Sequence, residues 1–118
     1  MKTFTELNLS PVLQGNLAKQ GFVQPTPVQA ESIPPALAGR DVVATAQTGT
    51  GKTLAFALPL IERLAKGGGA VRGIRAVVLS PTRELALQIN EAFTKIAAGT
   101  GIRSYIAEEK GWFFEGKR

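Results

Sequence analysis

The sequence predicts an α/β fold in which a short parallel sheet of about three strands lies between two layers of helices. Short apolar segments rich in β-branched residues alternate along the chain with longer segments whose apolar residues recur at helical spacing. Glycine or proline bounds these segments at the points where the chain has to change direction. Because parallel strands need a long crossover connection, usually a helix, this alternation predicts βαβ units.

The composition indicates one small folded domain and excludes several kinds of site. The chain has 118 residues, 44% of them hydrophobic and 19% charged, so a disordered chain is not expected. The absence of cysteine and histidine excludes disulfides, thiolate metal sites and a histidine general base. The net charge of +5 suits an anionic partner such as nucleic acid. Without a membrane-spanning apolar run or a signal peptide, we expect a cytoplasmic protein that does not bind membranes.

Two helices are expected within residues 1–40. The Ser-Pro pair at 10–11 and the Thr-Pro pair at 26–27 each place a capping side chain before a proline, which is a common way to begin a helix. The first helix should end at Gly21, because glycine terminates helices readily. The prolines at 34–35 should break the second helix and leave one further turn after them.

The middle of the chain should supply the sheet and the helices that cover it. Its short apolar segments have the length and β-branched content of buried strands, and its longer ones have the periodicity of helices. Pro59 should kink the first of these helices or remove one of its hydrogen bonds. The expected strands are 41–45, 76–79 and 102–107, and the expected helices are 52–66 and 83–98.

A glycine-rich loop between the first expected strand and the next helix has the pattern of a phosphate-binding loop. Glycines allow backbone N–H groups to converge on a phosphate, and the positive end of the following helix attracts the same anion. Lys52 can reach the β- and γ-phosphates, and the Thr53 hydroxyl can ligate Mg²⁺. A chance glycine-rich turn is the alternative, but a position between strand and helix favours nucleotide binding. The motif consists of Ala46, Gln47, Thr48, Gly49, Thr50, Gly51, Lys52 and Thr53.

With these residues the chain resembles the DEAD-box ATP-dependent RNA helicases of superfamily 2, especially bacterial ones. Residues 21–29, GFVQPTPVQ, are similar to the Q motif of that family, whose glutamine reads the adenine edge. Gln29 would do so here, because a carboxamide can pair with N6–H and N7 of adenine, whereas guanine offers two acceptors. The family also has an upstream aromatic residue that stacks on the base, and Phe4 is at the matching position. The alternatives are a surface residue for Gln29 and a core residue for Phe4.

Two further segments carry the resemblance. An alanine at the start of the phosphate loop, Ala46 here, is usual in motif I of the family. Residues 81–86, PTRELA, are similar to motif Ia, which contacts the RNA backbone in the family. Thr82 can cap a helix whose free N–H groups meet a phosphate, and Arg83 adds a charged fork. A capped helix with a solvated pair of charges is the alternative. The candidate RNA-contacting residues are Pro81, Thr82, Arg83 and Glu84.

The resemblance covers residues 3–102 and implies a partial, truncated P-loop NTPase domain of the RecA-like kind. In that interpretation residues 1–40 are a helical region with the Q motif, 41–107 are the partial ATP-binding core, and 108–118 are a divergent tail. Hydrolysis in the family requires an Asp-Glu-Ala-Asp motif, which holds Mg²⁺ and orients the attacking water. The sequence contains a single aspartate, Asp41, and this residue precedes the phosphate loop.

We therefore expect the ATP-binding and RNA-contacting N-terminal part of an ATP-dependent RNA helicase. By family it would be an ATP hydrolase, yet this chain is expected neither to hydrolyse ATP nor to unwind RNA. ATP and Mg²⁺ are the implied cofactors, and RNA is the implied partner, with contact that is weak or lost. The alternatives are a non-enzymatic adenine-nucleotide-binding module and an inactive gene remnant.

The end of the sequence leaves two alternatives open. The acidic pair at 108–109 could follow a strand as a substitute metal site, although Arg103 and Ser104 interrupt the apolar run that such a strand requires. The aromatic residues at 112–114 lie among basic ones and could stack on single-stranded nucleic acid. An unrelated tail, from a frameshift or an assembly edge, is the preferred interpretation. A sheet of few strands would leave apolar edges uncovered, so we expect a marginally stable, aggregation-prone fold.

Overall fold

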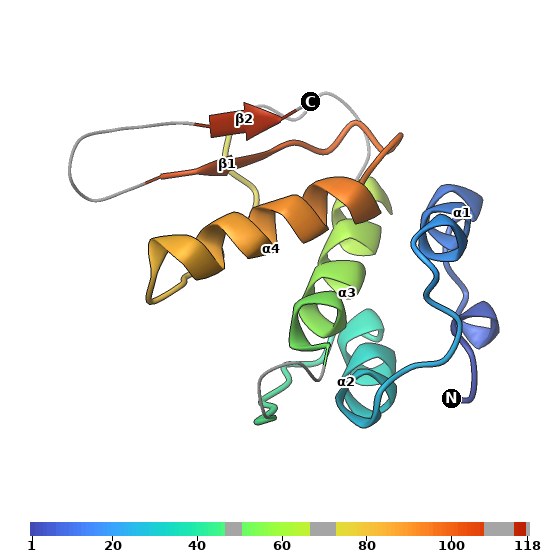
Figure 1. Cartoon of the computed structure of the whole chain (residues 1–118). Coiled ribbons are helices and arrows are strands. Elements are labelled where there is room, and N and C mark those ends of the chain that lie inside the picture. Colours follow the sequence, from blue (N-terminus) through green and yellow to red (C-terminus); the bar gives the residue numbers. More distant parts are fainter. Residues whose placement is uncertain (47–50, 67–72, 108–114, 118) are drawn as a thin grey trace.

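The computed structural model describes residues 1–46, 51–66, 73–107 and 115–117. In these residues the chain is mainly helical, and α3 lies between α2 and α4 and contacts both (Figure 1). The short sheet lies next to α4, which contacts β1. In chain order the elements are the 3₁₀ helix η1 (Phe4–Glu6), α1 (Pro11–Lys19), α2 (Pro27–Leu37), α3 (Lys52–Lys66), α4 (Arg83–Ile96), β1 (Ser104–Ile106) and β2 (Glu115–Lys117).

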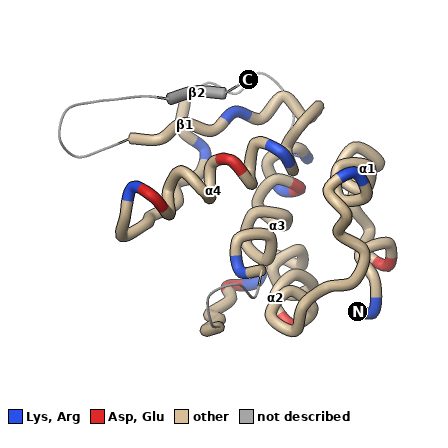
Figure 2. The backbone as a smooth tube through the Cα atoms, viewed as in Figure 1, with Lys and Arg blue, Asp and Glu red and all other residues tan. Residues whose placement is uncertain are grey.

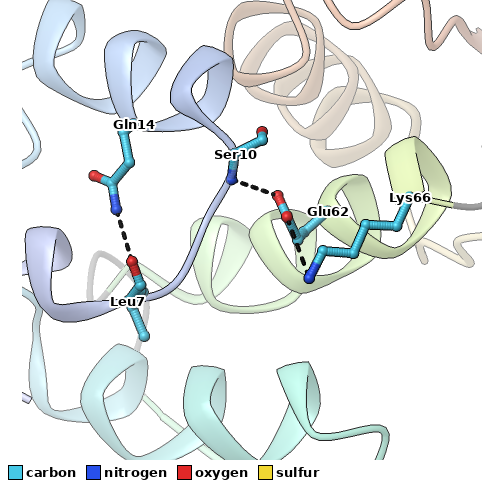
Figure 3. Close-up of polar contacts among 5 residues, drawn as sticks. All are labelled: Leu7, Ser10, Gln14, Glu62 and Lys66. Atoms are coloured by element: carbon cyan, nitrogen blue, oxygen red, sulfur yellow. Dashed lines mark hydrogen bonds and ion pairs between the residues drawn. The ribbon is translucent and has the colours of Figure 1, made fainter.

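The two helices expected near the N-terminus are present, but their first turns are held in different ways. Thr26 begins α2 with a capping box, in which its hydroxyl accepts from the Gln29 N–H and its own N–H donates to Gln29 Oε1. Ser10 makes no side-chain cap within the described residues. Its backbone N–H instead donates to a carboxylate oxygen of Glu62 on α3, at 3.3 Å (Figure 3). After α1 ends, Gly21 adopts a φ of 79°, as a residue that terminates a helix often does.

The expected break at the prolines of 34–35 is wrong, because α2 continues through both to Leu37. Each proline removes one N–H donor from the helix. The carbonyl groups of the same two residues still accept from the N–H groups of Ala38 and Arg40, at 3.1 Å each. Ile33 is fully buried in the core beside them, so packing holds this part of the helix in place.

The core forms where the helices meet, and α3 contributes more to it than any other helix. This agrees with the sequence of α3, which is apolar on most of its faces, and its Pro59 is itself buried. The end of α4 is fastened to α1 by Asn16, whose Nδ2 donates to the carbonyl groups of Ile96 and Ala98, both at 2.7 Å. The buried core residues are Phe4, Leu13, Leu17, Ile33, Leu54, Ala57, Leu58, Ile61, Phe93, Ile96 and Ala97.

The strands expected over 41–45 and 76–79 do not form in the part of the chain that the structure describes. Neither segment is assigned to a helix or a strand, and neither makes a backbone-to-backbone hydrogen bond there. Since a strand exists through the hydrogen bonds of a neighbour, a segment without such a neighbour stays exposed. Val43 is 97% exposed and Leu79 is 90% exposed. The described residues thus contain neither the parallel sheet nor the three layers that the sequence predicts.

The third expected strand is present in shortened form, and its pairing is antiparallel. β1 covers Ser104–Ile106, inside the expected range of 102–107, and it pairs with β2 so that Tyr105 lies opposite Gly116. β2 lies in the expected divergent tail, for which no strand was predicted. No helix among the described residues has the length and apolar character needed to cross a membrane.

Candidate nucleotide-binding site

The described part of the phosphate loop meets the N-terminus of α3. Gly51 has a φ of 84°, in the left-handed region that favours glycine, and Lys52 is the first residue of the helix. Lys52 is exposed and Thr53 is half-buried, so both can be reached from solvent. Ala46 is half-buried before the loop. The other predicted loop residues, Gln47, Thr48, Gly49 and Thr50, lie outside the described residues.

Gln29 joins the start of α2 to the end of this loop. Its Nε2 donates to the Gly51 carbonyl group at 3.1 Å, and its Oε1 accepts from the Thr26 N–H at 2.9 Å. Only 2% of Gln29 is exposed, so the alternative of a surface residue is wrong. A carboxamide has two N–H groups and two acceptor lone pairs. These two contacts therefore leave one donor and one acceptor site on the side chain.

The side chain of Gln29 fills the space that a side chain on Gly51 would need. A Cβ atom on Gly51 would overlap Nε2 of Gln29 and would also approach the Thr26 hydroxyl. Glycine is thus required here both for its backbone conformation and for its small size. The structure brings together one residue from each of the two motifs, and these two residues are 22 positions apart in the sequence.

Phe4 lies in the core, where only 1% of it is exposed. Its ring meets the ring of Phe22 edge to face, with centroids 6.3 Å apart. Its backbone is held on both sides, since its N–H donates to the Val23 carbonyl group and its own carbonyl accepts from Gln14 Nε2. Gln14 donates to the Leu7 carbonyl group as well (Figure 3). Core packing accounts for this position, and the stacking of Phe4 on adenine stays a prediction.

The predicted RNA-contacting residues lie where α4 begins. The Thr82 hydroxyl accepts from the Leu85 N–H at 3.1 Å and so caps the helix as expected. Pro81, Arg83 and Glu84 are exposed around it. Lys and Arg residues also occur on α1 and α3 and near β1, rather than on one element alone (Figure 2).

Acidic residues do not form a metal site in the part of the chain that is described. No group of three or more potential metal ligands occurs there. Asp41 is exposed in the segment before the phosphate loop. The acidic pair at 108–109 and the aromatic residues at 112–114 lie outside the described residues.

Glu62 is a polar residue that the sequence analysis missed. It is 2% exposed and lies one turn beyond Leu58 and next to Ile61, both of which are fully buried on α3. The signal in the sequence is a single acidic residue at a core position of an apolar helix. Such a residue needs partners from elsewhere in the chain, because buried charges are costly when they are unpaired.

Comparison with known proteins places these motifs in one family. The sequence profile of the DEAD/DEAH box helicase family matches residues 26–111. The chain is 48% identical over 104 residues to the ATP-dependent RNA helicase DBP10 of Eremothecium gossypii, covering 88% of this chain and 11% of that protein. It is 49% identical over 102 residues to the ATP-dependent rRNA helicase RRP3 of Meyerozyma guilliermondii, covering 86% of this chain and 21% of that protein.

Solved structures give the same result. A DEAD box protein from Methanococcus jannaschii superposes with a TM-score of 0.76 at 39% sequence identity, covering 84% of this chain and 26% of that protein. A hypothetical ATP-dependent RNA helicase from Sulfolobus tokodaii superposes with a TM-score of 0.68 at 31% identity, covering 79% and 25% respectively. The chain thus spans a small part of each relative's length.

Proposed function

Since the chain belongs to the DEAD/DEAH box helicase family, we propose that its 118 residues bind ATP with Mg²⁺ and contact RNA. By themselves they neither hydrolyse ATP nor unwind RNA. The observation that carries the proposal is the contact of Gln29 with Gly51. This contact places the carboxamide that can pair with adenine next to the loop that can bind phosphates. A single nucleotide that uses both groups requires them to be close together.

The proposed nucleotide site begins at the N-terminus of α3. The free N–H groups and the dipole of a helix N-terminus favour a phosphate. Lys52 would bind the β- and γ-phosphates there, with the backbone of loop residues 47–50, and the Thr53 hydroxyl would ligate Mg²⁺. The remaining donor and acceptor of Gln29 suit the N7 and N6–H of adenine. Bound Mg²⁺ would supply positive charge to the phosphates.

The proposed RNA contact lies at the N-terminus of α4. The capped first turn of this helix offers backbone N–H groups to a phosphate, and Arg83 and Pro81 lie exposed beside it. Contacts of this kind hold a strand without reading its bases. We accordingly propose binding to RNA that is independent of base sequence and weakens as salt is raised.

The proposed lack of hydrolysis follows from the acidic residues of the chain. Phosphoryl transfer to water needs groups that hold the metal and orient the attacking water. The sequence has one aspartate, and the described residues hold no acidic metal-ligand cluster.

By analogy with the family, we infer that residues 41–107 are part of a RecA-like core of three layers, preceded by the helical region 1–40 and followed by a divergent tail at 108–118.

The proposal is tested by calorimetric titration of the chain with ATP and with GTP in the presence of Mg²⁺. We expect selective ATP binding that Lys52→Ala weakens about tenfold or more, since a charged hydrogen bond to phosphate is lost. Lys19→Ala is the matched control, because it removes the same charge from an exposed position on α1. Equal loss in both variants would show only a general charge effect and would contradict the assigned site.

Two other outcomes distinguish the alternatives. Absence of binding to either nucleotide would favour an inactive remnant over a nucleotide-binding module. RNA-stimulated release of phosphate that Lys52→Ala abolishes would contradict the proposed lack of hydrolysis.

A further inference from the structure

A small cavity that is widely open to solvent lies between α3 and the segment that leads into α1. Its volume is about 290 Å³, and it is lined by Asn8, Leu9, Ser10, Glu62, Ala65 and Lys66. Figure 3 shows the backbone nitrogen of Ser10 and the Lys66 ammonium both directed at the Glu62 carboxylate. The cavity is near the C-terminal end of α3, while the proposed nucleotide site is at the N-terminal end. Ten residues separate Lys52 from Glu62, which is roughly 15 Å along a helix.

The carboxylate of Glu62 is buried here with one oxygen unsatisfied. Its side chain is 3% exposed, and Oε2 accepts from the Ser10 N–H at 3.3 Å. Oε1 is buried and has no hydrogen-bond partner in the described structure. The Lys66 ammonium lies 3.6 Å from Oε1, longer than the roughly 2.8 Å of a charge-assisted hydrogen bond. A buried acceptor left without a hydrogen bond carries a free-energy cost.

Lys66 does not supply the missing hydrogen bond to Oε1, because its side chain lies mostly in solvent. Its side chain is 67% exposed, so the ammonium remains hydrated and free to move away from the carboxylate. A stronger donor can therefore take the place of the Lys66 ammonium next to Oε1.

The other lining groups indicate which donor fits. Asn8 and Ser10 also line the cavity, and their side chains carry oxygen acceptors. Leu9 and Ala65 form the apolar part of the cavity wall. A guanidinium group is flat, weakly hydrated and carries N–H donors along its edge. It can place its edge against the oxygens and its faces against the apolar wall, whereas an ammonium is compact and strongly hydrated.

We propose that this cavity is a binding site for a guanidinium group, which donates to Glu62 Oε1 and displaces the Lys66 ammonium. The group belongs either to an arginine side chain of a polypeptide or to a small guanidino compound. The site is independent of the proposed nucleotide site, so either proposal can fail without the other.

The test is a titration of the ¹⁵N-labelled chain with methylguanidinium, followed by amide chemical shifts of the residues around Ser10 and Glu62. Methylammonium is the matched probe with the same charge. We expect saturable shifts with methylguanidinium, with a Kd on the order of 1 mM, and at least about tenfold weaker binding of methylammonium.

Two variants at neighbouring turns should change the affinity in opposite directions. Glu62→Gln keeps an oxygen for the Ser10 N–H but removes the charge, so methylguanidinium should bind about tenfold more weakly. Lys66→Ala removes the competing ammonium, so binding should become tighter by about threefold. A purely structural role for this pair predicts no gain from Lys66→Ala. The amide spectrum of each variant shows whether its fold is kept, and Lys66→Ala alters only an exposed side chain.

Several results would overturn the proposal. These are the absence of shifts with methylguanidinium, equal binding of methylammonium, or unchanged affinity in Glu62→Gln. A capped arginine amide distinguishes the two sources of the group. Tighter binding than methylguanidinium assigns the site to an arginine of a polypeptide, and equal or weaker binding assigns it to a small guanidino compound.

Discussion

Leu58 on α3 is fully buried, whereas Leu79 in segment 74–80, which is assigned to no helix or strand, is 90% exposed. The two regions have similar apolar residues but differ in how their backbone N–H and C=O groups are hydrogen-bonded. A helix makes its hydrogen bonds within one segment and needs only a partner for its apolar face. An extended segment needs a neighbour for its backbone before it can bury its side chains. Among the described residues the helices pack against one another, whereas the segments 41–46 and 74–80 make no backbone hydrogen bond to a neighbour.

The largest expected effect comes from the same substitution made in both regions. Leu58→Ala should lower the free energy of unfolding by about 2–5 kcal/mol, because it leaves a cavity in the core. Leu79→Ala should change it by less than about 0.5 kcal/mol, since the side chain has no packing to lose. Urea denaturation of both variants measures the difference. A similar loss in each would show that Leu79 is buried in solution and would remove the contrast between the regions.

The second test concerns Gly39, which precedes segment 41–46, and Gly51, which precedes α3. Gly39 and Gly51 have positive φ angles of 86° and 84°, so alanine at either costs about 1 kcal/mol in backbone strain. Open space surrounds Gly39, whereas a Cβ on Gly51 meets Gln29. Gly51→Ala should therefore be the more destabilising by about 1–2 kcal/mol, because it displaces the part-buried hydrogen bond from Gln29. Equal thermal stability of the two variants would mean that the contact of Gln29 with Gly51 contributes nothing.

The third test concerns the start of two helices. Thr82 lies between segment 74–80 and α4, and it caps the helix with its side chain. Thr82→Ala should cost about 1 kcal/mol. Ser10 makes no such bond in the structure as described, so Ser10→Ala should cost less than about 0.5 kcal/mol. Chemical denaturation of the pair tests this order, and a larger loss for Ser10→Ala would contradict it.

The smallest expected effect is a dependence on pH at the N-terminal edge of the helical region. Hydrogen bonds from the backbone N–H groups of Thr3 and Lys2, both at 2.6 Å, hold the pKa of Glu6 below its ordinary value. The ionised form thus favours the folded state above the unfolded pKa, and its contribution is lost as the pH falls through the folded pKa. We expect the melting temperature of the wild type to fall slightly more in acid than that of Glu6→Gln. Parallel curves for both proteins would refute the assignment.

The sequence predicts the helices well because their signals are local. The start of α3 at Lys52 and the cap of α2 at Thr26 each depend on residues within a few positions of one another. The proline pair at 34–35 was misjudged, because the burial of Ile33 outweighs two missing donors. Strand pairing depends on distant segments, so the apolar pattern predicts only that segments are extended and not what they pair with.

The candidate site shows the same division between local and distant signals. The motif around Gln29 and the loop up to Thr53 can be recognised in the sequence, because each is a continuous run of residues. The hydrogen bond between Gln29 and Gly51 cannot, since it depends on how α2 packs on α3. Glu62 was missed for the same reason, as its partner Ser10 is 52 positions away.

The contact that Asn16 makes with the end of α4 has a consequence for the order of folding during synthesis. Its two acceptors, the carbonyl groups of Ile96 and Ala98, are 80 and 82 positions further along the chain. At typical rates of translation this interval takes about 4–16 s. During that time α1 is held only by its other contacts, which include those of Gln14 with Phe4 and Leu7 and that of Ser10 with Glu62. The anchor between α1 and the end of α4 is thus among the last contacts of the described residues to form.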